Sequence, residues 1–167
     1  MPKKSSRKNK NLYLETREAL DLTRAEASEL TGISESRIEK IESEKTLPYP
    51  EDVLSMASAY KNPSLCNHFC SEDCPIGRKY VSPVKEKSLS EIVLEMLSLL
   101  NSLNRKKERL IDITADGSID DSELKDFAQI QKELEKISAS ADSLRLWIDQ
   151  KALAGSINEK ILEELKD

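Results

Sequence analysis

The sequence predicts an all-α protein, because of its helical apolar spacing and its scarcity of glycine. The clearest apolar residues recur at intervals of three and four, which is the period of a helix that buries one face. Only four of the 167 residues are glycine, which disfavours a turn-rich all-β protein. Aromatic residues make up 4% of the chain, so its core must consist mainly of Leu, Ile, Val and Ala.

Composition divides the chain into four segments. We expect a basic flexible tail at 1–10, a compact helical domain at 11–62, a Cys-rich connector at 63–85 and a helical oligomerisation module at 86–167. No apolar run approaches the ~20 residues that a membrane span needs, and no apolar stretch follows the basic start. We therefore expect a cytoplasmic protein without a membrane partner, whose cysteines are reduced by default.

Four helices are predicted in residues 11–62. The first covers about 12–20, and the second covers 24–31 after a capping box formed by Thr23 and Glu26. Gly32 suits the following turn because it tolerates positive φ, and Ser34 then caps a third helix. A fourth helix, 51–60, follows two prolines. The predicted core side chains are Leu12, Leu14, Leu20, Ile33, Ile38, Ile41, Val53, Leu54 and Ala57.

The stretch 12–62 carries an ordered series of core and turn residues. A Leu-Thr pair, a helix, a glycine, an aliphatic residue and a serine are followed by isoleucines, a glutamate, a lysine and a proline. These residues are Leu22, Thr23, Gly32, Ile33, Ser34, Ile38, Ile41, Glu42, Lys45 and Pro48. The pattern resembles the phage-repressor-like helix-turn-helix family, often called XRE or Cro-type. The resemblance implies a dimeric transcriptional regulator whose third helix enters the major groove of double-stranded DNA.

The same resemblance implies which residues meet DNA. Side chains of the third helix would face bases or phosphates, Arg24 would contact phosphate, and residues after the third helix would lie near the backbone. These positions are Arg24, Ser34, Glu35, Ser36, Arg37, Lys40, Lys45 and Thr46. In the tail, Lys3, Lys4, Arg7 and Lys8 either reach DNA or form a solubilising terminus. Arg24 replaces the family's usual Gln, and Glu44 stands where Gly often ends the third helix.

Charge conflicts with this interpretation. Residues 34–45 carry four glutamates, Glu35, Glu39, Glu42 and Glu44, against Arg37, Lys40 and Lys45. Because DNA affinity depends on phosphate neutralisation, an acidic recognition helix loses that contribution unless the tail or a second protomer provides it. The alternative is an adaptor that uses the repressor-like fold to dock a protein partner through this acidic helix.

All three cysteines and the single histidine lie within nine residues. Cys66, Cys70 and Cys74 have C-x3-C-x3-C spacing, with His68 between the first two. On a helix begun near Pro63, this spacing places the thiols on one face. Three interpretations are open: a buried apolar stripe, a zinc or iron–sulfur site, or a redox switch.

Residues 86–167 have heptad-like apolar spacing typical of a helical hairpin or coiled coil. After a capping box of Ser88 and Glu91, one stripe runs along residues 89–110 and a second along 124–148. Their members are Leu89, Ile92, Met96, Leu99, Leu103 and Leu110, then Leu124, Phe127, Ile130, Leu134, Ile137, Ala141, Leu144 and Ile148. The stripe is wide for one helix pair, so we predict a homodimer or a bundle with a last helix after Gly155.

The turn between these two stripes contains a loop with EF-hand-like spacing. Residues 112–123 place acidic side chains where calcium ligands stand in that loop, but Thr114 occupies one acidic position and no second hand is present. The alternative is a turn at Asp116–Gly117 followed by a helix N-cap. No nucleophile, base and orienting group occur together, so we expect no enzymatic activity.

Overall fold

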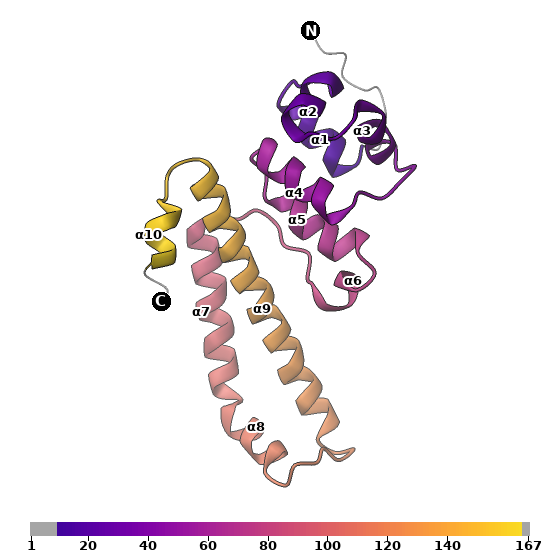
Figure 1. Cartoon of the computed structure of the whole chain (residues 1–167). Helices are drawn as coiled ribbons and strands as arrows, with labels where there is room; N and C mark the ends of the chain where they lie inside the picture. The colour runs from indigo at the N-terminus through magenta and orange to yellow at the C-terminus, as the bar shows by residue number, and fades with distance from the viewer. Residues whose placement is uncertain (1–9, 165–167) are drawn as a thin grey trace. The chain divides into compact units, whose positions relative to one another are not determined.

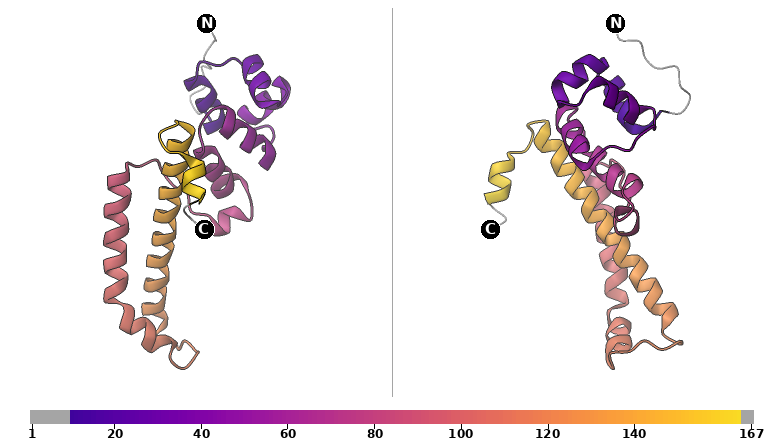
Figure 2. Two further views of the ribbon diagram at one scale, coloured as in Figure 1. Left: turned by 60° about the vertical axis from the view of Figure 1, so that its left-hand side comes forward. Right: turned by 45° about the vertical axis from the view of Figure 1, so that its right-hand side comes forward.

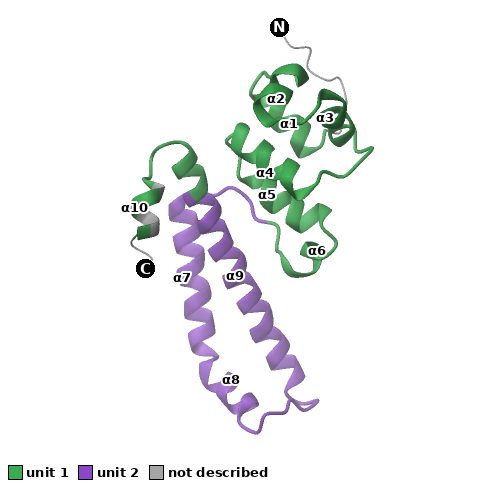
Figure 3. Ribbon diagram, in the orientation of Figure 1, with its two compact units in different colours: residues 1–83, 149–167 green, residues 84–148 purple. Residues whose placement is uncertain are grey.

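The computed structural model describes residues 10–164, and all regular structure in that range is helical (Figure 1), which confirms the predicted all-α class. The chain forms two compact units, residues 1–83 with 149–167 and residues 84–148 (Figure 3). Within the described range, no helix is long and apolar enough to cross a membrane. The elements are α1 (Leu12–Ala19), α2 (Arg24–Thr31), α3 (Glu35–Glu42), α4 (Pro50–Ala59), α5 (Ser64–His68), η1 (Phe69–Asp73), α6 (Gly77–Tyr80), α7 (Leu89–Arg105), α8 (Lys107–Thr114), α9 (Leu124–Leu153) and α10 (Glu159–Glu164).

Side-chain caps fix the ends of α2 and α3 as the sequence predicts. The Thr23 hydroxyl accepts a hydrogen bond from the Glu26 backbone N–H, and the Glu26 carboxylate accepts one from the Thr23 N–H at 2.7 Å. Gly32 ends α2 with a φ of 72°, and the Ser34 hydroxyl accepts from the Arg37 N–H to start α3. These caps satisfy backbone groups that the helices leave unpaired, so they stabilise the starts of α2 and α3.

In the first unit, strained residues follow the C-terminal ends of α1, α3 and α4. Asp21, Glu44 and Lys61 adopt φ values of 54°, 59° and 51° after α1, α3 and α4. A side chain in this left-handed region costs roughly 1 kcal/mol relative to glycine. Glu44 therefore has the backbone strain expected of a non-glycine residue at this position, where the phage-repressor-like family often has Gly.

The core of the first unit lies between α1, α2, α3, α4 and α5. Ile38, Ala27 and Leu65 are fully buried, and the other members are Tyr13, Ile33, Ile41, Val53, Met56, Ala57 and Tyr60. The predictions for Leu20 and Leu54 were wrong, because these side chains are 48% and 63% exposed. The buried face of α4 consists of Val53, Met56 and Ala57 and continues to Tyr60 at the C-cap. Leu54 directly follows Val53 in the chain, so the rotation of the helix turns its side chain away from this face.

Residues 64–80 pack as a further layer on this core. Leu65 of α5 is buried in it, and Cys66 and Phe69 pack against it in half-buried positions. The helix expected to carry all three thiols instead ends at His68 and continues as the π-helical turn η1, so Cys74 lies beyond it. Gly77 then passes so close to η1 that a Cβ atom there would lie 1.9 Å from the Cys70 carbonyl oxygen.

The second unit is an antiparallel hairpin of α7 and α8 against α9 (Figure 2). Ser102 donates to Glu133, and Arg109 lies 2.8 Å from Asp126, so later residues of α7 and α8 meet earlier residues of α9. Ile92, Ile113, Ile130 and Leu146 are buried on the inner faces. The first predicted stripe is interrupted at Lys106, which separates α7 from α8 and pairs with Glu133 at 2.6 Å.

The loop before α9 has the turn-and-cap geometry rather than a calcium loop. Asp116 accepts from the Ser118 N–H and Gly117 has a φ of 76°. The Asp120 carboxylate accepts from the Ser122 and Glu123 N–H groups. Residues 107–114 are already helical, so Asp112 and Thr114 belong to α8 and not to a loop.

We predict that Gly77→Ala destabilises the first unit by about 1–3 kcal/mol or more, because its methyl group would overlap the Cys70 carbonyl. Urea unfolding measures the change. Gly32→Ala is the matched control, since its added Cβ would meet nothing within 4 Å and only its φ is unfavourable. An equal loss in both variants would contradict this account of Gly77.

Candidate nucleic-acid interface

One side of α3 is exposed and the other is buried. Ile38 and Ile41 are at most 1% exposed, whereas the side chains of Glu35, Ser36 and Lys40 are open to solvent. The Asn11 side chain donates to the Ile41 carbonyl at 2.8 Å, which ties the start of α1 to the end of α3. The exposed side therefore projects from a helix whose position is set by packing, as a recognition helix requires.

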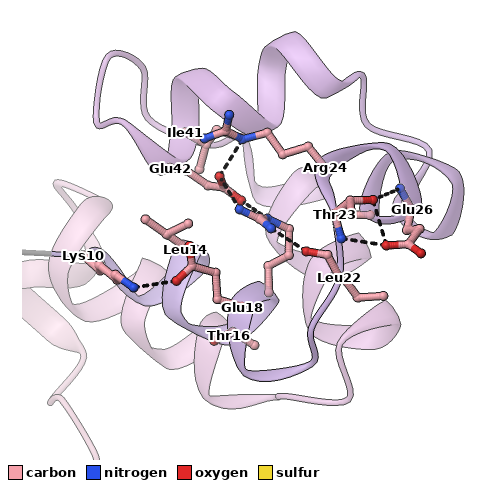
Figure 4. Close-up of polar contacts among 12 residues, drawn as sticks. Lys10, Leu14, Thr16, Glu18, Leu22, Thr23, Arg24, Glu26, Ile41 and Glu42 are labelled. Carbon is pink, nitrogen blue, oxygen red and sulfur yellow. Dashed lines mark hydrogen bonds and ion pairs between the residues drawn. The ribbon is translucent and has the colours of Figure 1, made fainter. Parts of the chain in front are cut away.

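The buried side of α3 also carries a charge. Glu42 is 3% exposed, and its carboxylate accepts two hydrogen bonds from the Arg17 guanidinium of α1, one of them at 3.0 Å (Figure 4). Arg17 is also buried and donates to the Leu22 carbonyl between α1 and α2. The hydrogen bonds to Glu42 raise the pKa of Arg17 despite the opposing effect of burial. A bidentate pair of this kind fixes both distance and orientation between α1 and α3.

Arg24 joins the same carboxylate from the start of α2. Its Nε atom lies 2.9 Å from Glu42 Oε2, and its side chain remains 40% exposed (Figure 4). Glu42 therefore connects α1, α2 and α3 through three guanidinium hydrogen bonds. A phosphate contact by Arg24 stays a prediction, and its partly exposed side chain is compatible with it.

Arg37 is held by the protein itself. Its guanidinium donates to Asp52 of α4, with Nε at 2.9 Å, and lies over the Tyr49 ring at 4.1 Å from the centroid. The hydrogen bonds from Arg37 and from the Tyr49 backbone outweigh burial and lower the pKa of Asp52. Arg37 therefore links α3 to α4, and its charge is largely neutralised before any partner binds.

The other residues that we predict to contact DNA lie on separate segments of the chain. Ser34 serves as the cap of α3, while Lys45 and Thr46 are exposed in the segment after it. The tail residues Lys3, Lys4, Arg7 and Lys8 lie outside the described residues. Lys10, at the edge of that tail, pairs with Glu18 of α1 at 2.6 Å.

Two of the charges in residues 34–45 are paired inside the protein and do not contribute to the exposed surface. Glu42 is one of four acids counted in residues 34–45, yet it is buried and paired with two arginines. Arg37, one of three bases, is paired with Asp52. The exposed side chains are the acids Glu35, Glu39 and Glu44 and the bases Lys40 and Lys45. The exposed surface keeps the excess of one acid that the whole stretch has, so it is still not basic.

The cysteine segment contacts the core of the first unit through Cys66. Cys66, Cys70 and Cys74 are half-buried free thiols, and the Gly77 N–H donates to Cys74 Sγ. Burial raises the pKa of the Cys66 thiol, which lowers its reactivity near neutral pH. Across residues 10–164, no three His, Cys, Asp or Glu side chains are grouped so that they could hold a metal ion. The His68 ring instead lies edge-on to the Tyr13 ring, with 5.7 Å between the two ring centroids.

The geometry of α2, the Gly32 turn and α3 agrees with the comparison to known families. Residues 15–63 match the model of a helix-turn-helix domain. This helix-turn-helix domain includes α2, α3 and α4, together with most of α1. The match supports a DNA-binding regulator. No curated protein and no solved structure matches the chain.

Glu42 belongs to the helix-turn-helix pattern, but its buried pairing with Arg17 was not predicted from the sequence. Glu42 was counted as a surface charge, although it lies four residues after Ile38 and one after Ile41, on the buried face of α3. Arg17 similarly lies three residues after Leu14 and four after Tyr13 on the buried face of α1. Helical spacing was therefore a usable signal for both, and charge obscured it.

We predict that Glu42→Gln lowers the free energy of unfolding by on the order of 3 kcal/mol, because it leaves Arg17 buried without a counter-charge. Urea denaturation measures the change. Glu39→Gln is the control on the same helix, and its exposed carboxylate predicts a change within about 0.5 kcal/mol. Equal stability of the two variants would show that the Arg17–Glu42 pair does not hold the fold.

Proposed function

We propose that this protein is a cytoplasmic, non-enzymatic transcriptional regulator that binds specific DNA sequences as a homodimer. The proposal extends the helix-turn-helix match at residues 15–63 to the phage-repressor-like mode of binding. In that mode α3 lies in the major groove and each protomer reads one half-site. The observation that carries the proposal is the exposed side of α3, held in place by Glu42 and its two arginines.

The exposed side of α3 has the donors and acceptors that base edges require. Ser36 can donate or accept, the Glu35 carboxylate can accept from cytosine N4, and Lys40 can donate to guanine or to phosphate. The α3 surface contributes no net positive charge, so it supports selectivity more than affinity. In this proposal, the rest of the affinity comes from Arg24, Lys45, the basic tail and the second protomer.

Dimerisation sets the form of the operator. Two α3 helices related by a two-fold axis fit half-sites that are about 34–36 Å apart, which is one turn of the duplex. Each protomer needs to supply only modest affinity, because the two half-sites are bound together.

Selection of bound duplexes from a random pool, by gel shift at low salt, tests the proposal. The expected result is enrichment of an inverted repeat with half-sites one helical turn apart. Failure to enrich any sequence at low salt would overturn DNA reading and favour the adaptor that docks a protein through α3.

We predict that Lys40→Ala weakens binding to the selected duplex about tenfold and, if Lys40 meets phosphate, makes the slope of log K against log salt shallower by about one unit. Fluorescence anisotropy across a salt series measures both quantities. Lys61→Ala is the charge-matched control, because Lys61 is exposed beyond α4 and not on α3. Identical salt slopes for the wild type and Lys40→Ala would exclude a phosphate contact by Lys40.

A further inference from the structure

The outward side of α7 exposes large aliphatic side chains. Leu94 and Leu97 are 69% and 53% exposed, and the neighbouring exposed residues are Leu89, Val93 and Leu100. We call these five residues the α7 outer face. Single exposed leucines are ordinary on a protein surface, but five on one helix form a patch that marks an interaction site.

The α7 outer face contains no charge. On a helix that turns by about 100° per residue, the five residues fall within an arc of roughly 140°. The other residues of that arc are Ser90, Asn101 and Asn104, which are polar and uncharged. The charged residues of α7, namely Glu91, Glu95 and Arg105, all lie outside it.

The α7 outer face adjoins the side of α7 that packs in the hairpin. Ile92 is 1% exposed there, and Met96, Leu99 and Leu103 are half-buried. The helix is therefore apolar on two adjoining sides, and the hairpin covers only one of them. A helix that buries a single face needs a much narrower stripe, so the second side is available to pack against another helix.

The outer face also has the repeat of a coiled-coil seam. Ser90, Val93, Leu97, Leu100 and Asn104 follow one another at intervals of three, four, three and four. In that register Asn104 occupies the same heptad position as Leu97. An asparagine at such a position fixes register and oligomeric state at a cost in stability, which is the behaviour of a seam selected for one partner.

We infer that a second copy of this chain covers the α7 outer face, so that α7 packs against α7 of its partner. A second copy presents the same uncharged face, so the contact buries no charged side chain of α7 without a counter-charge. Leu97 lies at the middle of the seam, where a two-fold axis would bring it against its own copy. The inference rests on the proposed function for its dimer, and adds which surface forms it.

Light scattering on the full chain tests the α7 outer face. Leu97→Glu is expected to convert the dimer to a monomer, because two carboxylates would be buried together at the axis. Leu134→Glu is the control: Leu134 is 46% exposed on α9, and this variant is expected to remain dimeric. Circular dichroism should show both variants folded, since neither side chain is in the core. A dimeric Leu97→Glu variant, or a monomeric wild type, would overturn the inference.

Two further variants test the seam itself. Leu97→Cys is expected to form a disulfide-linked dimer under mild oxidation well above the level of the wild type, which has three native cysteines. Asn104→Leu is expected to add oligomers larger than a dimer, because it removes the polar residue that restricts the seam. Failure of Leu97→Cys to cross-link above the wild type would place Leu97 away from the axis and overturn the inference.

These outcomes are separable from the test of DNA binding. A wild type that is dimeric through Leu97 but enriches no duplex would retain the α7 interface and refute the proposed regulator. A wild type that enriches an inverted repeat while Leu97→Glu stays dimeric would retain the regulator and refute this interface.

Discussion

The helix-turn-helix arrangement depends on one buried carboxylate. Glu42 of α3 accepts hydrogen bonds from Arg17 of α1 and Arg24 of α2, so three helices are joined at a single point. The hydrophobic effect is not directional, whereas a bidentate guanidinium–carboxylate pair adds a specific distance and orientation between helices. Burial makes the pair important for stability, because removing either partner leaves a buried charge without solvent or a counter-charge. The exposed side of α3 is consequently displayed from a fixed frame.

Such ion pairs engage charged side chains of α3 that would otherwise be free to contact a partner. Glu42 is withdrawn from the surface by its arginines, and Arg37 is withdrawn by Asp52 and Tyr49. What remains on the outside of α3 is polar, with slightly more acids than bases, which suits selection among partners better than strong attraction to DNA phosphates. A second protomer is therefore central to the proposed function, and the uncharged outer side of α7 is the surface we assign to it.

Much of the helix-turn-helix domain was predictable because its signals are local. The Thr23–Glu26 capping box, the Gly32 turn, the Ser34 cap and the buried Ile38 and Ile41 all follow from residues within one or two helical turns of each other. The errors arose where one residue was placed on the wrong side of a helix, as with Leu54. The end of α5 was also misplaced, because a π-helical turn at Phe69–Asp73 has no simple apolar period to reveal it.

The sequence by itself determined the helical class, the caps and the turn, since each depends on backbone groups and side chains that are neighbours along the chain. The tertiary structure alone decided which charges face solvent. Arg17 and Glu42 are 25 residues apart, and Arg37 and Asp52 are 15 apart. Whether such pairs meet depends on how the helices between them pack. Composition gives the net charge of this stretch, and only the packed structure shows which of its charges remain available for a partner.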